Sequence, residues 1–451
     1  MACKIRIKVK KKKYIRGDNT TMKYTSIIIP FVGGLGMFIY GMQIMAQGLE
    51  NAAGNRMKSL LEALTKNKFF GVLLGAFITA VIQSSSATTV MVVGFVNAGI
   101  MNLQQAMGVI MGANIGTTVT GWLVSSVEWA KFLSPSNLAP VAIMIGVIIM
   151  LTGKRRSTKD IASIVVGFGL LFVGISSMSS AVEPLKDNAA FCNIFVSLGH
   201  NPLLGIVAGA AVTAIIQSSS ASVGILQSLA AAGLVPFGAA IYIIMGQNIG
   251  TCVTALLSAI GANKNAKRAA MIHLYFNLIG TVVFMILFYL INAAVHFPFM
   301  TQMATPATIA ITHSVFNITA TLVWLPFSNL LVKLACLTIR DDKKDEVSKE
   351  DQEFMILESR FLEKPAFAVE QGRNAARQME KDSRKALNIA LDLIYDYSEE
   401  QAERVQKIEA KVDRYEDELG TYLVKLNNKN LSERDSHSVS IMLHCIGDFE
   451  R

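Results

Sequence analysis

Gln83-Ser84-Ser85-Ser86-Ala87 and Gln217-Ser218-Ser219-Ser220-Ala221 are two copies of one phrase in a single chain. Each copy lies inside an apolar run and is followed by a second shared phrase. The second phrase is Met111-Gly112-Ala113-Asn114-Ile115-Gly116-Thr117 in the first copy and Met245-Gly246-Gln247-Asn248-Ile249-Gly250-Thr251 in the second. Both phrases recur at an offset of 134 positions, which indicates a duplicated structural unit.

The duplication extends beyond these phrases into glycine-rich stretches. Gly71 and Gly75 match Gly205 and Gly209 at the same offset. With a slip of one residue, the glycines of the first apolar run match those of a later run: Gly34, Gly36 and Gly41 correspond to Gly167, Gly169 and Gly174. The repeats therefore cover about 34–120 and 167–254. Small residues at such positions let membrane helices approach closely.

Composition divides the chain into an apolar part and a charged part. Hydrophobic residues make up 52% of the 451 residues, and 26 of the 33 acidic residues lie at or after Asp341. This predicts a membrane domain over 26–338, followed by a soluble helical domain over 339–451. The basic segment 1–25 and the short basic loops account for the net charge of +9, which indicates cytoplasmic flanks and not nucleic-acid binding. Residues 1–21 precede a second plausible start at Met22.

We expect membrane helices in nine apolar segments, at least one of which is broken. They are 26–46, 70–98, 104–126, 138–152, 161–180, 203–233, 237–260, 269–294 and 305–337. The last is too long for one simple span and contains Pro306 and Pro326. An interfacial helix is expected over 50–68. The five cysteines (Cys3, Cys192, Cys252, Cys336 and Cys445) have no paired spacing and suggest neither disulfides nor a zinc site.

The serine phrases are the natural places for helix breaks. A single serine in a membrane helix usually packs or bonds to a carbonyl one turn back. Three consecutive serines point in different directions, however, and serine favours the first cap of a helix. Paired breaks at matching positions in two repeats are typical of a transport site near the middle of the bilayer. The free N–H groups of the restarted helices would favour an anion.

The asparagine phrases offer neutral oxygen atoms beside flexible glycines. The candidate ligands are Asn114, Thr117, Thr118, Asn248 and Thr251. Such oxygens suit Na⁺, and no carboxylate lies in any of the four phrases, so proton coupling through a buried acid is poorly supported.

A third pair of phrases places His273 and Asn277, and likewise His313 and Asn317, four residues apart. This spacing puts each pair on one helix face. An interhelical hydrogen bond is the favoured interpretation, because two histidines are too few for a metal site.

On these phrases, the chain resembles the bacterial branch of the type II sodium–phosphate cotransporter family over about residues 26–338. The resemblance implies an all-α polytopic membrane protein with two inverted repeats that contain broken or re-entrant helices. It also implies Na⁺-coupled phosphate uptake by alternating access, with Na⁺ as coupling ion and no other cofactor. The implied binding residues are Gln83, Ser84, Ser85, Ser86, Thr88, Asn114, Thr117 and Thr118 in the first copy and Gln217, Ser218, Ser219, Ser220, Asn248 and Thr251 in the second.

The two copies differ at positions that supply oxygen atoms. Thr88-Thr89 is matched by Ser222-Val223, and Thr118 by Cys252. We therefore expect the two halves to do different jobs.

The tail resembles a PhoU-like helical domain. Apolar residues recur at helical spacing, for example at Val412, Tyr415, Leu419, Tyr422 and Leu426. The closing stretch Leu443–Arg451 looks like the start of an acidic metal-binding motif, but we expect this domain to be incomplete and assign it no metal site. Its expected role is regulatory or scaffolding, through a partner or a second copy of the chain.

Two other functions remain open. The substrate could be another oxyanion, such as sulfate or arsenate, because tetrahedral anions present similar oxygens. A membrane sensor that binds phosphate and signals through the tail is a second alternative, although sensing does not require two related halves. An enzyme is disfavoured, because no nucleophile–base pair or nucleotide loop occurs in the spans. We expect the protein in the bacterial plasma (inner) membrane, with its tail in the cytoplasm.

Overall fold

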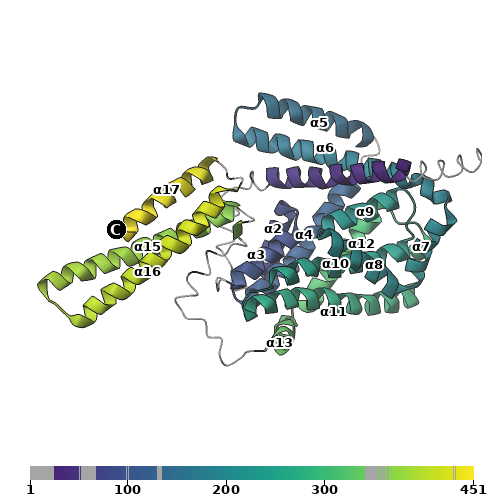
Figure 1. Cartoon of the computed structure of the whole chain (residues 1–451). Coiled ribbons are helices and arrows are strands. Elements are labelled where there is room, and N and C mark those ends of the chain that lie inside the picture. Colours follow the sequence, from purple (N-terminus) through teal and green to yellow (C-terminus); the bar gives the residue numbers. More distant parts are fainter. Residues whose placement is uncertain are drawn as a thin grey trace, which may run out of the picture. The chain divides into compact units, whose positions relative to one another are not determined.

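The computed structural model describes residues 25–49, 51, 68–97, 99, 101–129, 135–340, 354, 357, 361–362, 365–429, 431 and 433–451. Within these ranges the chain is helical and forms no β-strand, which confirms the predicted all-α fold (Figure 1). The predicted interfacial helix at 50–68 lies almost entirely outside the described residues. The chain divides into two compact units, which we call the transport unit (Met1–Thr89, Met107–Ser258, Ala270–Leu334) and the tail unit (Val90–Ala106, Ala259–Ala269, Ala335–Arg451).

Six of the described helices are long and apolar enough to cross a bilayer. They are the helix Thr25–Leu49, α4 (Leu103–Trp129), α6 (Arg156–Val182), α10 (Phe237–Ser258), α11 (Lys264–Val295) and α12 (Pro306–Trp324). A seventh span results if α7 (Ala189–His200) and α8 (Pro202–Ile216), between which the chain bends by 112°, count as one. The sequence did not predict α7.

Helix breaks occur at both serine phrases, as predicted. The first break separates α2 (Lys68–Ile82) from α3 (Ser85–Asn97), and the second separates α8 from α9 (Ser219–Ala231). Gln83 and Gln217 end the incoming helices in the left-handed region, with φ of 56° and 57°. A side chain there costs about 1–2 kcal/mol, so both breaks are enforced by their surroundings. The expected span 305–337 is also two helices, α12 and α13 (Ser328–Thr338).

Matching glycines make the same close backbone crossing in both repeats. A Cβ atom added at Gly75 or at Gly209 would lie 2.1 Å from a carbonyl oxygen of the crossing helix, that of Val109 or Ile243. Gly112 and Gly246 lie on the other side of the same crossings. A Cβ atom added at Gly112 would lie 2.0 Å from a carbonyl oxygen of α2, and one added at Gly246 would lie 2.0 Å from a carbonyl oxygen of α8. The crossings of α2 with α4 and of α8 with α10 therefore require glycine at these positions.

The first helices of the two repeats pack reciprocally. A Cβ atom added at Gly34 would lie 2.8 Å from the carbonyl of Gly174, and one added at Gly41 would lie 2.7 Å from that of Gly167. Because Gly34 matches Gly167 and Gly41 matches Gly174, each contact is the repeat image of the other. In these two contacts the residue numbers rise along the helix Thr25–Leu49 while they fall along α6. The two helices are therefore antiparallel, as inverted repeats require.

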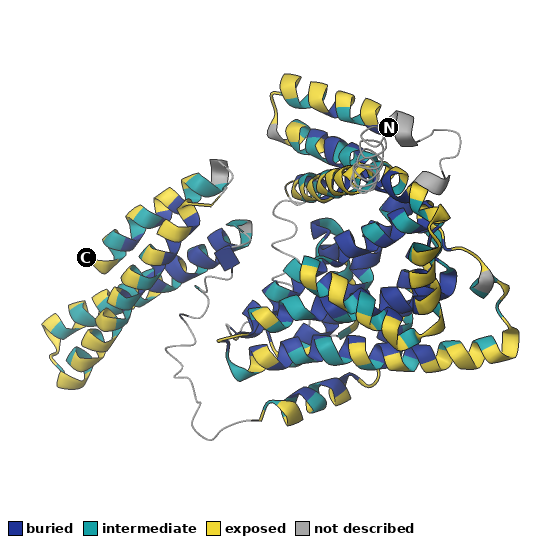
Figure 2. Cartoon of the chain, turned by 45° about the vertical axis from the view of Figure 1, so that its right-hand side comes forward, coloured by how far each residue is buried: buried dark blue, intermediate teal, exposed yellow. Residues whose placement is uncertain are grey.

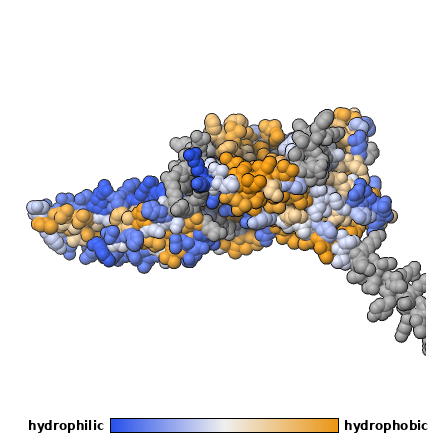
Figure 3. Space-filling view, turned by 90° about the horizontal axis from the view of Figure 1, so that it is seen from above, coloured by the Kyte–Doolittle hydropathy of each residue, from blue (hydrophilic) through white to orange (hydrophobic). Residues whose placement is uncertain are grey.

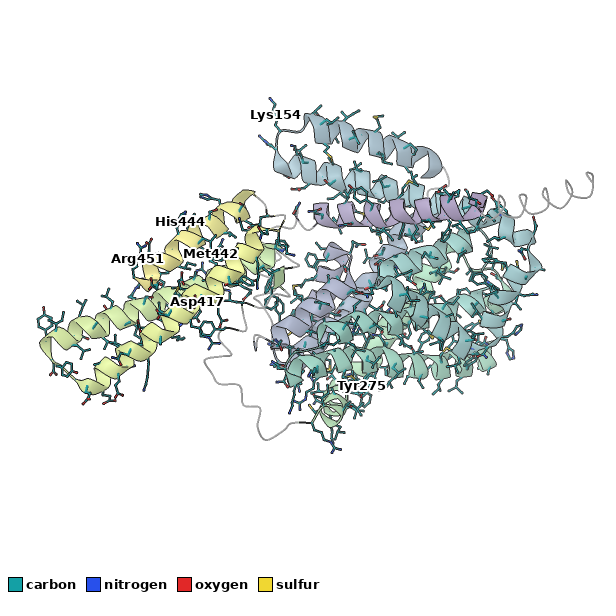
Figure 4. All side chains as sticks on the ribbon, viewed as in Figure 1. Lys154, Tyr275, Asp417, Met442, His444 and Arg451 are labelled. Atoms are coloured by element: carbon teal, nitrogen blue, oxygen red, sulfur yellow. The ribbon has the colours of Figure 1, made fainter. Side chains whose placement is uncertain are left out.

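The outer faces of the transport unit are apolar. Large apolar side chains are exposed on α5 (Pro135–Thr152), α8 and α11, including Leu151 at 81% and Ile215 at 82%. These exposed surfaces are visible in Figure 2, and Figure 3 shows apolar side chains gathered on one face. Exposure of this kind matches a lipid environment. Lys154 lies on the polar turn between α5 and α6 (Figure 4).

The tail unit contains a bundle of three helices, α15 (Pro365–Tyr395), α16 (Glu399–Asn427) and α17 (Glu433–Glu450). The predicted apolar stripe of α16 is buried, including Tyr415, Leu419 and Leu426. His444 of the closing stretch lies exposed on α17 (Figure 4). Among the residues with described positions, no three His, Cys, Asp or Glu side chains gather as a metal site would need.

Candidate functional site

The two helix breaks bring the starts of α3 and α9 together. Ser85 and Ser219 are the first residues of these helices, and their hydroxyl oxygens lie 3.3 Å apart. Both side chains are buried, at 3% and 6% exposure. The two serine phrases thus form one site, although 134 positions separate them.

Each restarted helix is capped by the preceding serine. The hydroxyl oxygen of Ser84 accepts a hydrogen bond from the Ala87 N–H at 3.2 Å, and that of Ser218 accepts from the Ala221 N–H at 3.2 Å. The first N–H groups of a helix have no acceptor within the helix, and they carry the positive end of its dipole. Because α3 and α9 start at one point, two positive ends meet there. Among the described residues of the transport unit, no Asp, Glu, Lys or Arg side chain is buried.

The asparagine phrases present oxygen atoms. The Nδ2 of Asn114 donates to the Ile110 carbonyl at 2.9 Å, and the Nδ2 of Asn248 donates to the Ile244 carbonyl at 3.0 Å. A carbonyl can only accept, so each Oδ1 is the atom that the amide offers to its surroundings. Thr117 and Thr251 donate to backbone carbonyls one turn back, both at 2.9 Å, which leaves their lone pairs as acceptors.

Thr88 holds the first broken helix together. Its hydroxyl receives a hydrogen bond from Thr79 at 3.0 Å, across the break between α2 and α3. Thr213 and Ser222 form the matching bond at 2.9 Å in the second repeat, so the change from threonine to serine preserves this link. Ser86 is half-buried, and its carbonyl accepts from the Thr89 hydroxyl at 3.1 Å.

The expected difference between Thr118 and Cys252 also changes a hydrogen bond. Thr118 donates to the Ile115 carbonyl at 2.7 Å, within its own helix. Its counterpart Cys252 turns to α11, where its sulfur accepts from the Nδ2 of Asn277 at 3.3 Å.

Thr120 is a site residue that the sequence did not reveal. Its hydroxyl donates to the Oε1 of Gln83 at 2.9 Å and lies 3.4 Å from the hydroxyl of Ser220, so it joins the two serine phrases. The counterpart Thr254 donates instead to the Thr251 carbonyl of its own helix at 2.8 Å. Gln83 is accordingly buried, whereas Gln217 is exposed. The only sequence signal was that Thr120 recurs as Thr254 at the repeat offset.

The sequence analysis also did not select Gln247, which occupies the position equivalent to Ala113 of the first repeat. Its Nε2 donates to the carbonyl and the hydroxyl of Ser222 at 3.0 and 2.9 Å. The second repeat thus carries an extra amide behind its serine phrase. The mismatch between alanine and glutamine was the available signal.

His313 makes the predicted interhelical hydrogen bond. Its Nε2 lies 3.3 Å from the Oδ1 of Asn248, and it is the donor because an amide oxygen only accepts. His273 is fully buried and makes no such bond through either ring nitrogen.

Comparison with known proteins bears on both parts of the chain. The family model described as Na+/Pi-cotransporter matches twice, at residues 37–180 and 182–325. This chain belongs to the Na+/Pi-cotransporter family. A PhoU domain model matches residues 376–451. The family is one of phosphate transporters, so the relatives of this membrane protein are not enzymes.

Individual relatives agree with this assignment. The uncharacterized protein YqeW of Bacillus subtilis (strain 168) is 30% identical over 69% of this chain and 98% of its own length. YjbB of Escherichia coli (strain K12), which is provisionally named for inorganic phosphate export, is 25% identical over 91% of this chain and 73% of its own length. Sodium-dependent phosphate transport protein 2B of Homo sapiens is 38% identical over 27% of this chain and 19% of its own length. No solved structure matches this chain.

Proposed function

We propose that this protein carries inorganic phosphate across the bacterial plasma membrane together with Na⁺, by alternating access. The observation that carries the proposal is the meeting of two helix starts at Ser85 and Ser219, whose hydroxyls lie 3.3 Å apart. A polar site that both repeats build inside an apolar domain is typical of a secondary transporter.

Phosphate fits the serine phrases. A tetrahedral oxyanion needs several donors at once, and the two helix starts supply backbone N–H groups beside the hydroxyls of Ser85, Ser86, Ser219 and Ser220. Neutral donors bind the anion without trapping it as a buried arginine would, which suits a site that must also release its substrate.

Sodium fits the asparagine phrases. Asn114 and Thr117 in α4, and Asn248 and Thr251 in α10, use their hydrogens on backbone carbonyls and offer oxygen lone pairs. A hard monovalent cation suits such neutral oxygens. Because no carboxylate is buried among the described residues of the transport unit, Na⁺ is favoured over a proton as the coupling ion.

Alternating access is supported by the unequal conformations of equivalent residues. Gln83 is buried and bonded to Thr120, whereas Gln217 is exposed and Thr254 bonds within its own helix. If the inverted repeats exchange conformations, the opposite state buries Gln217 against Thr254, and Thr254 approaches Ser86.

A second candidate is phosphate export, because the relative that aligns over 91% of this chain, YjbB, is named for that activity. The same site would serve either direction, and the ion gradients would decide between them. We further propose that the tail, residues 339–451, lies in the cytoplasm and regulates transport.

The test is uptake of radioactive phosphate into proteoliposomes with an inward Na⁺ gradient, against an equal choline gradient. We expect uptake that depends on Na⁺, persists when a protonophore collapses the pH gradient, and is not competed by sulfate. Uptake that is indifferent to Na⁺ would contradict symport. Efflux driven by an outward phosphate gradient without Na⁺ would favour export, and competition by sulfate would broaden the substrate to other oxyanions.

A further inference from the structure

Helix α3 starts at the serine site and ends in the tail unit. Its first residues, Ser85 to Thr89, belong to the transport unit, and its last residues, Val90 to Asn97, belong to the tail unit. At a rise of about 1.5 Å per residue, roughly 15 Å of unbroken helix separates Ser85 from Phe95. A helix is a rigid element, so a restraint on its far end also acts on its start.

Three phenylalanine rings gather at the far end of α3. Phe95 of α3 packs on Phe361, which precedes α15, and on Phe367 of α15 itself. The ring centres are 5.7 Å apart for Phe95 and Phe361, and 4.8 Å apart for Phe95 and Phe367. The rings of Phe361 and Phe367 complete the cluster at 5.0 Å. Phe95 and Phe361 are each 2% exposed, so this is a buried aromatic contact.

Gly94 provides the space that Phe361 occupies. A Cβ atom added at Gly94 would lie 2.7 Å from Cε1 of the Phe361 ring, closer than unbonded carbon atoms approach. A side chain at this position would therefore displace the ring. Glycine weakens a helix interior relative to alanine, and the ring that it admits here explains its presence.

Hydrogen bonds fix the same end of α3 to α11 and to the start of the tail. The Oδ1 of Asn97 accepts from the Asn263 N–H at 2.8 Å, and the Asn97 carbonyl accepts from the Asn263 side chain at 2.7 Å. Asn263 directly precedes α11. Arg268 of α11 is buried, and its guanidinium donates twice to the Ile339 carbonyl, at 3.0 and 2.8 Å. Because the tail begins at Ile339, two routes connect α3 to it.

The equivalent helix of the second repeat lacks the residues that make these contacts. At the repeat offset, Gly94, Phe95 and Asn97 correspond to Ser228, Leu229 and Ala231. The end of α9 packs within the transport unit, where the hydroxyl of Ser179 on α6 donates to the Ser228 carbonyl at 3.0 Å. Packing needs that both repeats share would not produce this difference. The aromatic cluster is therefore specific to α3.

A fixed end of α3 opposes the movement that alternating access requires. Under the proposed function, the conformations of Gln83 and Gln217 are exchanged between the two states, so the start of α3 must move. The far end is held by Phe361, Phe367 and Asn263, and it resists this movement. The attachment thus stabilises the conformation in which Gln83 is buried.

We propose that the tail inhibits transport in the same chain, and that Phe361 packed against Gly94 is the autoinhibitory contact. A change in the tail bundle reaches α3 through α15, because Phe367 belongs to that helix. The restraint on α3 does not depend on transport, but its use as an inhibitory contact rests on the proposed function.

The first test measures how firmly α3 is held, with no substrate present. In the full-length chain without native cysteines, Gln83→Cys reports on the start of α3, and Gln217→Cys reports on the equivalent position. Phe361→Ala should raise the rate at which a water-soluble maleimide labels Gln83→Cys at least about tenfold, because the buried ring stabilises the closed position by more than this factor. Labelling of Gln217→Cys should stay as it is without the Phe361 change.

A double-mutant cycle and a matched control identify the contact. Gly94→Ala displaces the same ring, so it should also accelerate labelling of Gln83→Cys, and Gly94→Ala with Phe361→Ala should add little to either change alone. The control is Phe354→Ala, because Phe354 is buried in the same unit but packs on Tyr415 of α16, with ring centres 4.5 Å apart. This control should leave the labelling rate unchanged. If Phe361→Ala does not fold, Gly94→Ala carries the test, since it removes no side chain.

Uptake measurements decide whether the contact slows transport or supports it. In proteoliposomes with an inward Na⁺ gradient, Phe361→Ala and Gly94→Ala should raise the maximal rate of phosphate uptake, and Phe354→Ala should not. Slower uptake by the first two variants would overturn autoinhibition. Labelling of Gln83→Cys that does not respond, or that responds additively in the double variant, would also overturn it. An equal rise at Gln217→Cys would indicate general loosening and counts against the contact.

The two kinds of measurement separate the contact from the proposed function. If phosphate uptake proves indifferent to Na⁺ while Phe361→Ala still accelerates labelling of Gln83→Cys, symport fails and the restraint on α3 stands. If uptake depends on Na⁺ but neither labelling nor uptake responds to Phe361→Ala, symport stands and the autoinhibitory contact is overturned.

Discussion

Ser85 and Ser219 occupy the same position in two inverted repeats, and their hydroxyl oxygens lie 3.3 Å apart. A residue can touch its own repeat image only where the pseudo-twofold axis between the repeats passes. The serine contact therefore marks that axis inside the transport unit. Under the function proposed above, a substrate bound at this contact would meet both halves of the protein.

Replacement of either serine by alanine should weaken phosphate binding. In Ser85→Ala or Ser219→Ala, one hydrogen bond to an anion is lost, which is worth about 1.5–3 kcal/mol, or roughly ten- to a hundredfold in affinity. Phosphate uptake as a function of phosphate concentration measures the effect. The control is Ser163→Ala, because the Ser163 hydroxyl is exposed and donates to the Lys159 carbonyl of its own helix. Unchanged uptake in both serine variants would indicate that these residues contribute to helix packing and not to phosphate binding.

Equivalent glutamines should differ in chemical accessibility. In a background that lacks the five native cysteines, Gln217→Cys should react readily with a water-soluble maleimide, because Gln217 is exposed. Gln83→Cys should be protected, since Gln83 is buried at 7% exposure. Na⁺ and phosphate should change the two labelling rates in opposite directions. Rates that rise or fall together would argue against an exchange of conformations between the repeats.

Close helix crossings should make certain glycines irreplaceable. In Gly209→Ala the new methyl group would lie 2.1 Å from the Ile243 carbonyl, and the helices must separate to accommodate it. We expect little folded protein, as judged by a monodisperse peak in size-exclusion chromatography. Gly33→Ala should behave as the wild type, because nothing lies within 4 Å of the added atom. Equal yields of the two variants would show that α8 and α10 cross less closely than described.

Removal of the tail should leave the membrane helices inserted. Among the described residues, every candidate span ends before residue 341, and membrane helices satisfy their backbone polar groups internally. A chain that stops after Arg340 should therefore stay in the membrane fraction after extraction with alkaline carbonate. Release into the soluble fraction would show that the tail is needed for insertion.

The sequence predicted both helix breaks because the polar run that marks a break occurs twice, once in each repeat. Polar runs such as Ser84–Ser86 stand out in an apolar segment, and their recurrence at Ser218–Ser220 excluded chance. Sequence reasoning missed α7, which lies between two of the predicted apolar segments and, at 12 residues, is too short to cross a bilayer alone.

Differences between equivalent residues could not be read from the repeated phrases. Gln83 and Gln217 are identical in type and context, yet Gln83 is buried and Gln217 is exposed. Thr120 bonds to Gln83, whereas its counterpart Thr254 bonds within its own helix. The repeated phrases are the same in both halves, so they do not predict which residue of an equivalent pair makes a given hydrogen bond.

The reciprocal contact of Gly34 with Gly174 and of Gly41 with Gly167 has a consequence for assembly. Each repeat presents a surface that fits its own inverted image, as the subunits of a symmetric dimer do. The two repeats therefore pack as the subunits of a dimer would, although one peptide chain joins them. A chain divided at the turn that carries Lys154, and expressed as two fragments, should reassemble in the membrane, with the glycine contacts in place of the peptide bond.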